Sequence, residues 1–257
     1  MFFMNLIGLY AQEITIADFE EKGISNLYRK SRSSKIANSK LTPWRVLADG
    51  DKLLINAQNW ERSSPEIPPF EIDTTCRFKG LTGGAVSKKV ANGWLIIRFC
   101  DLFSDLGWYS VDGKDSYVIS KGQYAKLADY KGKIITYHNP SHLGFNSGGI
   151  YEIYFDNSDN TWKLKEIYSS SDSYPIAITS DKEGNNYIVT SSALVKISAE
   201  KTEYLLKDMY GSVLSTPNSI ALHKGNVFLG MQGGILKVTE KKYSVEVEWL
   251  MEKPLSK

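Results

Sequence analysis

Two copies of one pattern follow each other near the C-terminus: Pro175-Ile-Ala-Ile-Thr-Ser-Asp-Lys-Glu-Gly-Asn-Asn-Tyr-Ile-Val-Thr190 with Leu194-Val-Lys-Ile197, then Pro217-Asn-Ser-Ile-Ala-Leu-His-Lys-Gly-Asn-Val-Phe-Leu-Gly230 with Gly234-Ile-Leu-Lys-Val238. Each copy predicts an apolar strand, a glycine turn, a second strand, a short polar loop and a third strand. Self-similarity of this kind is typical of repeat architectures. The stretch therefore predicts an all-β chain built from repeated units.

The same unit can be followed towards the N-terminus through the glycine that precedes each second strand. These glycines are Gly50, Gly93, Gly132, Gly184 and Gly225. They recur about every 40 to 50 residues, which is the length of a four-stranded propeller blade. The spacing predicts a single β-propeller of about five four-stranded antiparallel blades, with six as the alternative, over residues 41–253.

The polarity of the expected strands, named A to D, rises along each unit. Strand A is short, as in residues 219–222, and strand B is almost continuously apolar, as in residues 187–190. Strand C alternates, as in residues 150–154, and strand D is more polar, as in residues 245–249. A continuously apolar strand is one that is buried on both faces. The gradient therefore predicts radial sheets, with strand A at the inner edge and strand D at the outer edge.

Two segments carry a resemblance to a known superfamily. Ile176-Ala-Ile-Thr-Ser-Asp-Lys-Glu-Gly-Asn-Asn-Tyr-Ile-Val-Thr190 and Ser219-Ile-Ala-Leu222 with Val227-Phe-Leu-Gly230 resemble blades of the β-propeller superfamily, closest to sensor-type and NHL-like repeats. The resemblance is best over residues 174–240, weaker over 84–155 and poor before Gly50. Its motifs place strands and turns and specify no ligand, so it implies a fold rather than an activity.

The N-terminal residues 1–12 form an apolar run, Met1-Phe-Phe-Met-Asn-Leu-Ile-Gly-Leu-Tyr-Ala-Gln12, that is too short to span a bilayer. The run is typical of the remnant of a secretory signal, and a buried N-terminal strand is the alternative. We therefore expect an exported protein, periplasmic or extracellular, with no transmembrane segment. Residues 13–40 are irregular and fit either a closing strand or a tail.

Composition narrows the class of partner. The chain has 31 basic and 29 acidic residues and a net charge of +2, which gives no basic footprint for nucleic acid. Cys76 and Cys100 could form a disulfide in an exported protein or remain two buried thiols, and their separation does not fit a zinc site. We expect a monomer without a cofactor that binds a protein, a small molecule or a glycan.

The loops between strands B and C share one face with the D-to-A connections if the blades have the predicted order. Three of these loops are expected to be long, 58–69, 100–106 and 139–148, and two short, 191–192 and 231–232. Loops on a rigid scaffold commonly carry binding residues. The predicted ligand-binding residues belong to or flank the long loops: Trp60, Arg62, Arg98, Asp101, Asp105, His138, Asn139, His142 and Phe145.

The histidines of the third long loop raise the alternative of a divalent metal site. His138 and His142 would need a third ligand, such as Asp101, whereas a polar loop with hydrogen-bonding histidines needs none. Asn218, in Pro217-Asn-Ser-Ile-Ala221, is similar to the calcium-binding asparagine of propeller lactonases. The Glu-Gly-Pro motif that those enzymes also use is absent from this sequence, which favours a simple blade entry at Asn218.

The sequence thus predicts a non-catalytic binding or interaction module that uses the long-loop face. It contains no Gly-x-Ser-x-Gly elbow, no phosphate-binding glycine loop and no His-Glu-x-x-His motif. Two alternatives stay open. One is a metal-dependent hydrolase or lactonase, or a saccharide lyase, of the propeller type. The other is an inhibitor or immunity-type partner of a secreted protein.

Overall fold

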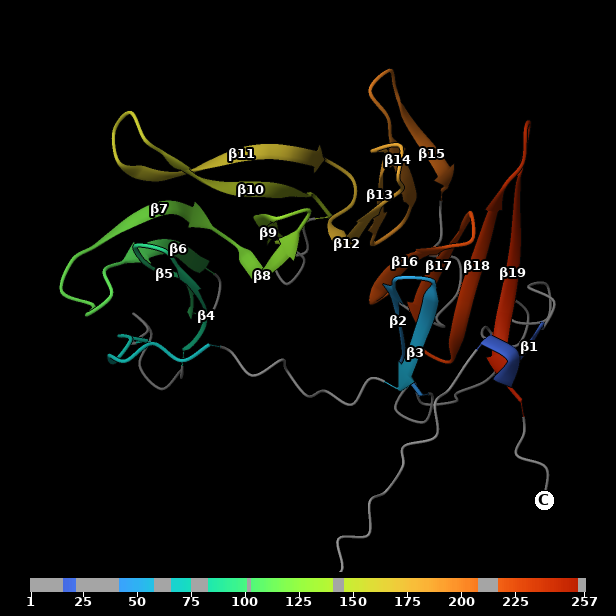
Figure 1. Ribbon diagram of the computed structural model, residues 1–257, viewed down its shortest axis with the longest axis horizontal. Coiled ribbons are helices and arrows are strands. Elements are labelled where there is room, and N and C mark those ends of the chain that lie inside the picture. The colour runs from blue at the N-terminus through green and yellow to red at the C-terminus, as the bar shows by residue number, and fades with distance from the viewer. Residues whose placement is uncertain are drawn as a thin grey trace, which may run out of the picture.

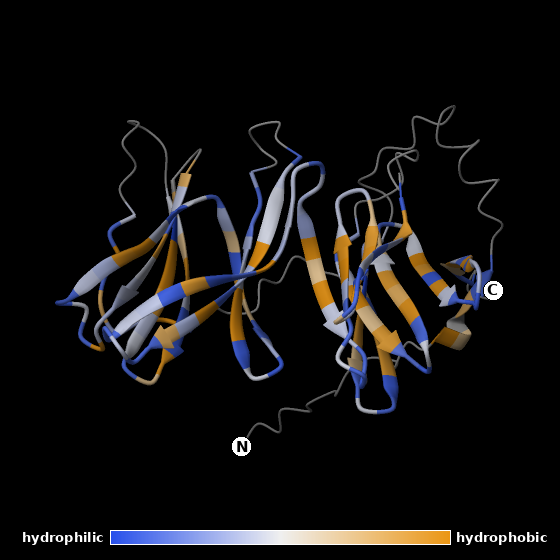
Figure 2. Ribbon diagram, turned by 90° about the horizontal axis from the view of Figure 1, so that it is seen from above, coloured by the Kyte–Doolittle hydropathy of each residue, from blue (hydrophilic) through white to orange (hydrophobic). Residues whose placement is uncertain are grey.

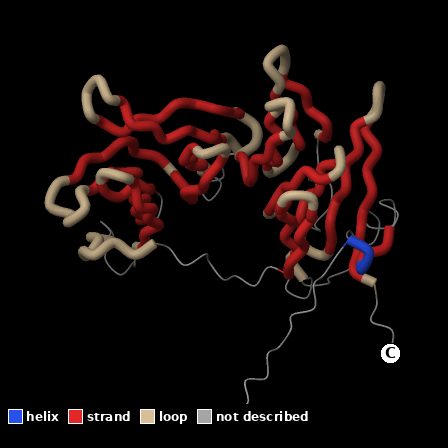
Figure 3. Tube along the Cα trace, in the orientation of Figure 1, coloured by secondary structure: helices blue, strands red, loops and turns tan. Residues whose placement is uncertain are grey.

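The computed structural model describes residues 16–21, 42–57, 66–74, 83–100, 103–140, 146–207 and 217–253. These residues form nineteen strands and one short 3-10 helix, η1 (Ile16–Asp18), and none of them is in an α-helix. The strands make five antiparallel sheets that follow one another like the blades of a propeller (Figures 1 and 3). The prediction of an all-β propeller with about five blades is confirmed. Within the described part, no helix is long and apolar enough to cross a membrane.

In chain order, blade 1 consists of β2 (Trp44–Asp49) and β3 (Lys52–Ala57), and blade 2 of β4 (Gly84–Val90), β5 (Gly93–Cys100), β6 (Phe103–Tyr109) and β7 (Ser116–Gly122). Blade 3 consists of β8 (Tyr124–Tyr130), β9 (Lys133–His138), β10 (Gly148–Asp156) and β11 (Thr161–Ser170), and blade 4 of β12 (Pro175–Ser180), β13 (Asn186–Thr190), β14 (Leu194–Ile197) and β15 (Thr202–Leu206). Blade 5 consists of β16 (Ser219–His223), β17 (Asn226–Met231), β18 (Gly234–Glu240) and β19 (Val245–Glu252). Blades 2 to 5 have four strands in the predicted order A to D, whereas blade 1 has two strands in the described residues.

Each glycine that marked the repeat lies at the turn between strands A and B of its blade, and each has a positive φ. The values are 56° at Gly50, 152° at Gly93, 71° at Gly132, 93° at Gly184 and 74° at Gly225. Glycine adopts such angles readily because it has no Cβ, and other residues pay a steric penalty there. The turn conformation is therefore the physical reason for the glycine at this point of every unit.

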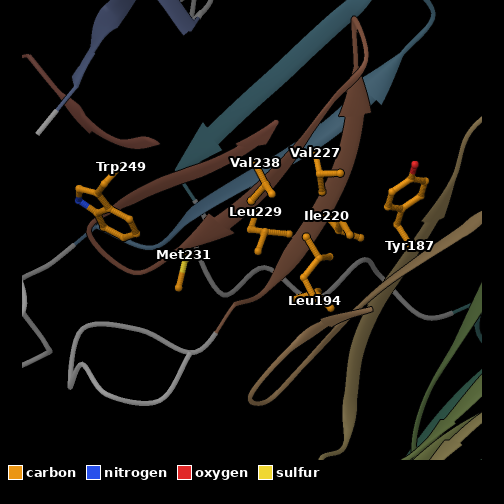
Figure 4. Close-up of a cluster of buried hydrophobic side chains, with 9 residues drawn as sticks. Tyr187, Leu194, Ile220, Val227, Leu229, Met231, Val238 and Trp249 are labelled. Carbon is orange, nitrogen blue, oxygen red and sulfur yellow. The ribbon is translucent and has the colours of Figure 1, made fainter. Parts of the chain in front are cut away.

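Four clusters of buried side chains join neighbouring blades. Leu194 of blade 4 packs with Ile220 and Leu229 of blade 5 in the cluster shown in Figure 4. Similar clusters join blade 2 to blade 3, blade 3 to blade 4, and blade 5 to blade 1. Figure 2 shows the hydrophobic residues gathered along the strands and the hydrophilic ones at many of the turns. Each fully buried aliphatic side chain contributes about 1.5–3 kcal/mol, so these interfaces hold the blades together.

The first blade lies beside the last one. The backbone N–H of Val46 in β2 donates a hydrogen bond of 2.9 Å to Ser219 Oγ in β16. Pro43, just before β2, forms an isolated antiparallel bridge with Gln232, just after β17. First strands of successive blades also contact one another, β4 with β8, β12 with β16 and β16 with β2. The end of the chain therefore returns to its beginning around these inner strands, as the blade order of a propeller requires.

Part of the N-terminal segment forms a further strand on the outer edge of blade 5. β1 (Phe19–Glu21) pairs antiparallel with β19, with Glu20 opposite Met251. The Phe19 ring meets the Trp44 ring of blade 1 edge-on, with 5.0 Å between the centroids. Residues 19–21 thus contribute to the contact between the first and last blades. Residues 13–15 and 22–40 lie outside the described residues.

An extended segment, residues 66–74, covers the face of blade 2 that is turned away from blade 3. The Glu66 backbone carbonyl accepts a hydrogen bond from Ser87 Oγ, and its Oε2 accepts one of 2.7 Å from the Lys89 backbone N–H. Phe70 stacks on Tyr109, with 6.0 Å between the ring centroids. This segment brings part of the chain that follows blade 1 into contact with blade 2.

Candidate binding face

The B–C connections and the D–A connections meet on one face of the propeller, as predicted. We call this the loop face and define it by the described strand ends that border the connections 101–102, 123, 139–147, 171–174, 191–193, 207–218 and 232–233; residues 101–102, 141–145 and 208–216 themselves lie outside the described part. Backbone hydrogen bonds tie the two kinds of connection together. The Asn139 N–H donates to the Gln123 carbonyl at 2.8 Å, and the Gly233 N–H donates to the Thr42 carbonyl at 2.8 Å. The ends of the strands on this face are therefore fixed.

The connections on the loop face differ in length, as predicted. The connection of blade 2, however, is short, whereas a long one was predicted. Residues 139–147 join β9 to β10, whereas 191–193 and 232–233 are tight connections. The long loop predicted over residues 100–106 is wrong, because β6 already begins at Phe103. Ser104 faces blade 3, so the next side chain, Asp105, lies on the opposite face of the strand. Polar residues on one face of a strand were thus mistaken for a loop.

The structure brings together two of the predicted site residues, Arg98 and Asp105. They lie opposite each other on β5 and β6, with 3.4 Å between Arg98 Nη2 and Asp105 Oδ2. Both side chains are about one-third exposed, so solvent screens the pair and its contribution to stability is about 0–1 kcal/mol. The pair lies on the face of blade 2 that carries residues 66–74. It is therefore separated by the sheet from blade 3.

His138 lies on the other side of blade 2, at the contact with blade 3. It ends β9, and its ring meets the Tyr124 ring edge-on, with 5.8 Å between the centroids. Burial lowers the pKa of His138 below its ordinary value of 6.5, so the imidazole is neutral at pH 7. A neutral imidazole offers one hydrogen-bond donor and one acceptor. It is suited to an uncharged polar group of a ligand.

Ser104, which the sequence did not single out, holds the strand against which His138 packs. Its Oγ accepts a hydrogen bond of 2.5 Å from the Tyr124 N–H and donates one of 3.0 Å to the Tyr124 carbonyl. The Tyr124 hydroxyl donates in turn to Ser120 Oγ at 2.6 Å. These bonds fix the Tyr124 ring and, through it, the position of His138. A serine in a stretch that was predicted to be a loop gives no signal of this role in the sequence.

The described site residues form two groups on opposite faces of blade 2: Arg98 with Asp105, and His138 with Asn139. The other predicted site residues lie outside the described part of the chain: Trp60, Arg62, Asp101, His142 and Phe145. Cys76 and the side chain of Cys100 also lie outside it. Within the part that the structure describes, no three His, Cys, Asp or Glu side chains are grouped as a metal site requires.

Asn218 directly precedes β16 and makes hydrogen bonds within blade 5. Its backbone N–H donates to the Gly230 carbonyl at 2.9 Å, and its Oδ1 accepts from Ser219 Oγ at 2.8 Å. The first bond joins the start of strand A to strand B of the same blade, and the second joins Asn218 to the residue that follows it. This is the arrangement expected of a blade entry.

No protein-family model matches the chain, and no curated protein has a significantly similar sequence. The class of protein is therefore defined by the fold alone, an all-β propeller-like arrangement with a loop face of unequal connections.

Proposed function

We propose that this protein is a non-catalytic binding or interaction module that holds its ligand on the loop face. The observation that carries the proposal is the contrast on this face between fixed strand ends and connections of unequal length. Residues 139–147 join β9 to β10, whereas the corresponding connections of blades 4 and 5 span only 191–193 and 232–233. Binding residues concentrate on loops that a rigid scaffold positions. The unequal loops would give one side of the face a shape that the repeat itself does not have.

The chemistry available on this side favours a polar, uncharged group of the ligand. His138 is neutral and half-buried, and Asn139 follows it at the start of the long connection. Imidazole and amide groups donate and accept hydrogen bonds without adding charge. A glycan, a polar small molecule or a loop of a protein partner fits such groups. Trp60, Arg62, Asp101, His142 and Phe145 stay predicted contributors to the same site.

We place the module outside the cytoplasm, in the periplasm or the extracellular space. The apolar run of residues 1–12 supports this location, since it has the length and residue types of a secretory signal remnant. Fractionation of cells that express the full chain tests the location, and a product found in the cytoplasm with residues 1–12 intact would contradict it.

The binding proposal is tested by a thermal-shift screen of the purified protein against glycans, polar small molecules and lactones, repeated with His138→Ala and Trp60→Ala. His223→Ala is the matched control, because His223 ends β16 on the opposite rim of the propeller. A ligand of the loop face should raise the Tm of the wild type and of the control. Loss of one hydrogen bond should weaken its binding to His138→Ala about two- to tenfold. Identical ligand-induced shifts in all four proteins would show that the ligand binds elsewhere.

A further inference from the structure

Four aromatic side chains meet where blades 2 and 3 contact each other on the rim opposite the loop face. Trp108 near the end of β6 and Tyr117 near the start of β7 come from blade 2, whereas Phe155 near the end of β10 and Trp162 near the start of β11 come from blade 3. All four are half-buried. Figure 1 shows β7 beside β11, and the two strands are in contact. We call these four residues the aromatic cluster.

Asn92, which is exposed in the A–B turn of blade 2, joins the two tryptophans of the cluster. Its Oδ1 accepts a hydrogen bond of 3.2 Å from Trp108 Nε1 and one of 3.1 Å from Trp162 Nε1. An indole N–H can only donate, so the carboxamide must present its oxygen to both rings. One side chain thus holds the indoles of two different blades.

Further contacts fix the rings in place. The Trp108 and Tyr117 ring centroids are 5.4 Å apart, and Phe155 meets Trp162 edge-on, also at 5.4 Å. Both indoles pack against the buried side chains between blades 2 and 3, among them Leu106. A surface of pre-positioned aromatic rings loses little conformational entropy when it binds a ligand.

Within the described residues, two hydrogen-bond donors of this site have no partner. The Asn92 Oδ1 is occupied by the indoles, but the two N–H groups of its Nδ2 are free. The Tyr117 hydroxyl accepts a bond of 2.6 Å from the Trp162 backbone N–H and keeps its own proton to donate. Both donors are uncharged and border the rings.

The charges beside the cluster do not favour an anion. Lys163, which follows Trp162, pairs with Asp156 at 2.7 Å and with Asp159 at 2.6 Å. In the C–D turn of blade 2, Lys114 pairs with Asp112 at 3.1 Å. These cations are therefore already compensated. A cationic ligand could use the ring faces but not the two free donors, whereas an uncharged ligand that carries oxygen acceptors can use both.

We propose that the aromatic cluster, together with Asn92, binds an uncharged saccharide chain. The C–H groups on the face of a pyranose ring carry partial positive charge, which suits the negative face of an aromatic ring. The hydroxyl and ring oxygens of the sugar can accept hydrogen bonds from Asn92 Nδ2 and from the Tyr117 hydroxyl. Aromatic side chains with a few placed polar groups are the usual composition of a small-ligand site. This site lies on the other rim and does not depend on a ligand at the loop face.

The test follows the indole N–H signals of the isotope-labelled full-length protein by NMR while a neutral oligosaccharide is added. Cellotetraose, xylotetraose, mannotetraose and maltotetraose are used separately, at up to about 10 mM, which exceeds the millimolar dissociation constants of weak sites. Trp108→Phe and Trp162→Phe assign the two signals. At least one chain should shift both signals saturably and leave the signal of Trp249, in the core of blade 5, unchanged.

Three variants separate binding from structure. Asn92→Ala removes the free donors from an exposed turn and should weaken the binding about two- to tenfold. Trp162→Ala removes a ring face and should weaken it about tenfold or more. Tyr243→Ala is the matched control, because Tyr243 is an exposed aromatic residue in the C–D turn of blade 5 on the same rim, and it should bind as the wild type does. The indole spectrum of each variant also shows whether it is folded.

The saccharide site is overturned if none of the four chains shifts the two indole signals, or if Asn92→Ala binds as well as Tyr243→Ala. A response that Asn92→Ala retains and His138→Ala loses would also overturn it, while supporting a ligand on the loop face. A response that His138→Ala retains and Asn92→Ala weakens would support the aromatic cluster and leave the loop-face proposal to be decided by its own screen.

Discussion

Substitution of Gly230 by alanine should separate the first blade from the last. Gly230 lies on β17, where the backbone of β2 crosses it. A Cβ on Gly230 would lie 2.5 Å from the Trp44 carbonyl oxygen and 3.0 Å from Arg45 Cα, and it would also contact Ser219 Oγ. The first two are backbone atoms, which cannot rotate away as a side chain can. Blade 1 must therefore shift as a unit to admit one methyl group.

The expected cost combines two effects. Overpacking of a tight contact costs about 1–3 kcal/mol. The shift also disrupts the buried hydrogen bond of 2.9 Å between the Val46 N–H and Ser219 Oγ, and an unsatisfied buried donor costs about 1–3 kcal/mol. The two effects overlap, because both relax with the same movement of β2. We expect the free energy of unfolding to fall by about 2–4 kcal/mol.

Urea unfolding of Gly230→Ala and of Gly84→Ala measures this cost with a matched control. A Cβ on Gly84 would have only Phe99 Cδ2 nearby, at 4.0 Å, which is an ordinary contact. The double variant Ser219→Ala/Gly230→Ala removes the hydroxyl but leaves the Trp44 carbonyl in place, so it should not recover stability. The reasoning is refuted if Gly230→Ala is as stable as Gly84→Ala, or if the double variant is restored to the wild-type value.

Three further changes test the packing and charge assigned to particular side chains. Tyr187→Phe removes a hydrogen bond of 2.8 Å to Glu240 Oε1 that joins blades 4 and 5, and should lower the free energy of unfolding by about 1 kcal/mol; no change would show that the bond is not formed. Leu229→Ala empties a fully buried position and should cost about 2–5 kcal/mol in urea unfolding, whereas a cost below about 1 kcal/mol would place Leu229 outside the core. The pKa of Lys126 is about 8 in the folded protein, against an ordinary value of 10.5. Between pH 8 and pH 10.5 only the unfolded state keeps this proton, so the free energy of unfolding of the wild type should gain a favourable contribution as the pH rises through this range. Lys126→Met should lack this contribution in a pH series of urea unfolding, and identical pH profiles would contradict the assignment.

The glycine turns and the strands beside them are predictable from sequence because their causes are local. A positive φ at Gly184 and Gly225 favours glycine through local sterics alone, and these positions mark the same turn in each blade. The apolar residues of 194–197 form β14 as expected, since a strand buried against two neighbours has few alternatives. Local rules thus suffice for the A–B turns and for strands such as β14.

The loop of blade 2 is mispredicted because strand polarity depends on what covers each face. Asp105 pairs with Arg98 on a face that residues 66–74 cover, and an ion pair is as acceptable there as an apolar contact. The sequence between 100 and 106 does not contain the information that a segment from another part of the chain lies over it.

The contact between blade 1 and blade 5 is non-local for the same reason. Nothing in the sequence of β2 points to a partner strand, and only the fold brings the Val46 N–H to Ser219 Oγ of blade 5. A closing strand is one of two alternatives for residues 13–40, and the three residues of β1 carry no periodic pattern that would place it. Contacts between the first and last blades are thus the part that the sequence could not supply.

The contact between the first and last blades is tested most directly by an engineered disulfide. Pro43→Cys and Gln232→Cys are combined in a Cys76→Ser, Cys100→Ser background, because residues 43 and 232 lie opposite each other in an antiparallel bridge. Cα atoms in such pairs are about 4.5–5.5 Å apart, within the range of a disulfide. Non-reducing electrophoresis should show a cross-linked monomer after mild oxidation, whereas Pro43→Cys with Lys182→Cys should stay open. Equal oxidation of the two pairs would contradict the contact between the first and last blades.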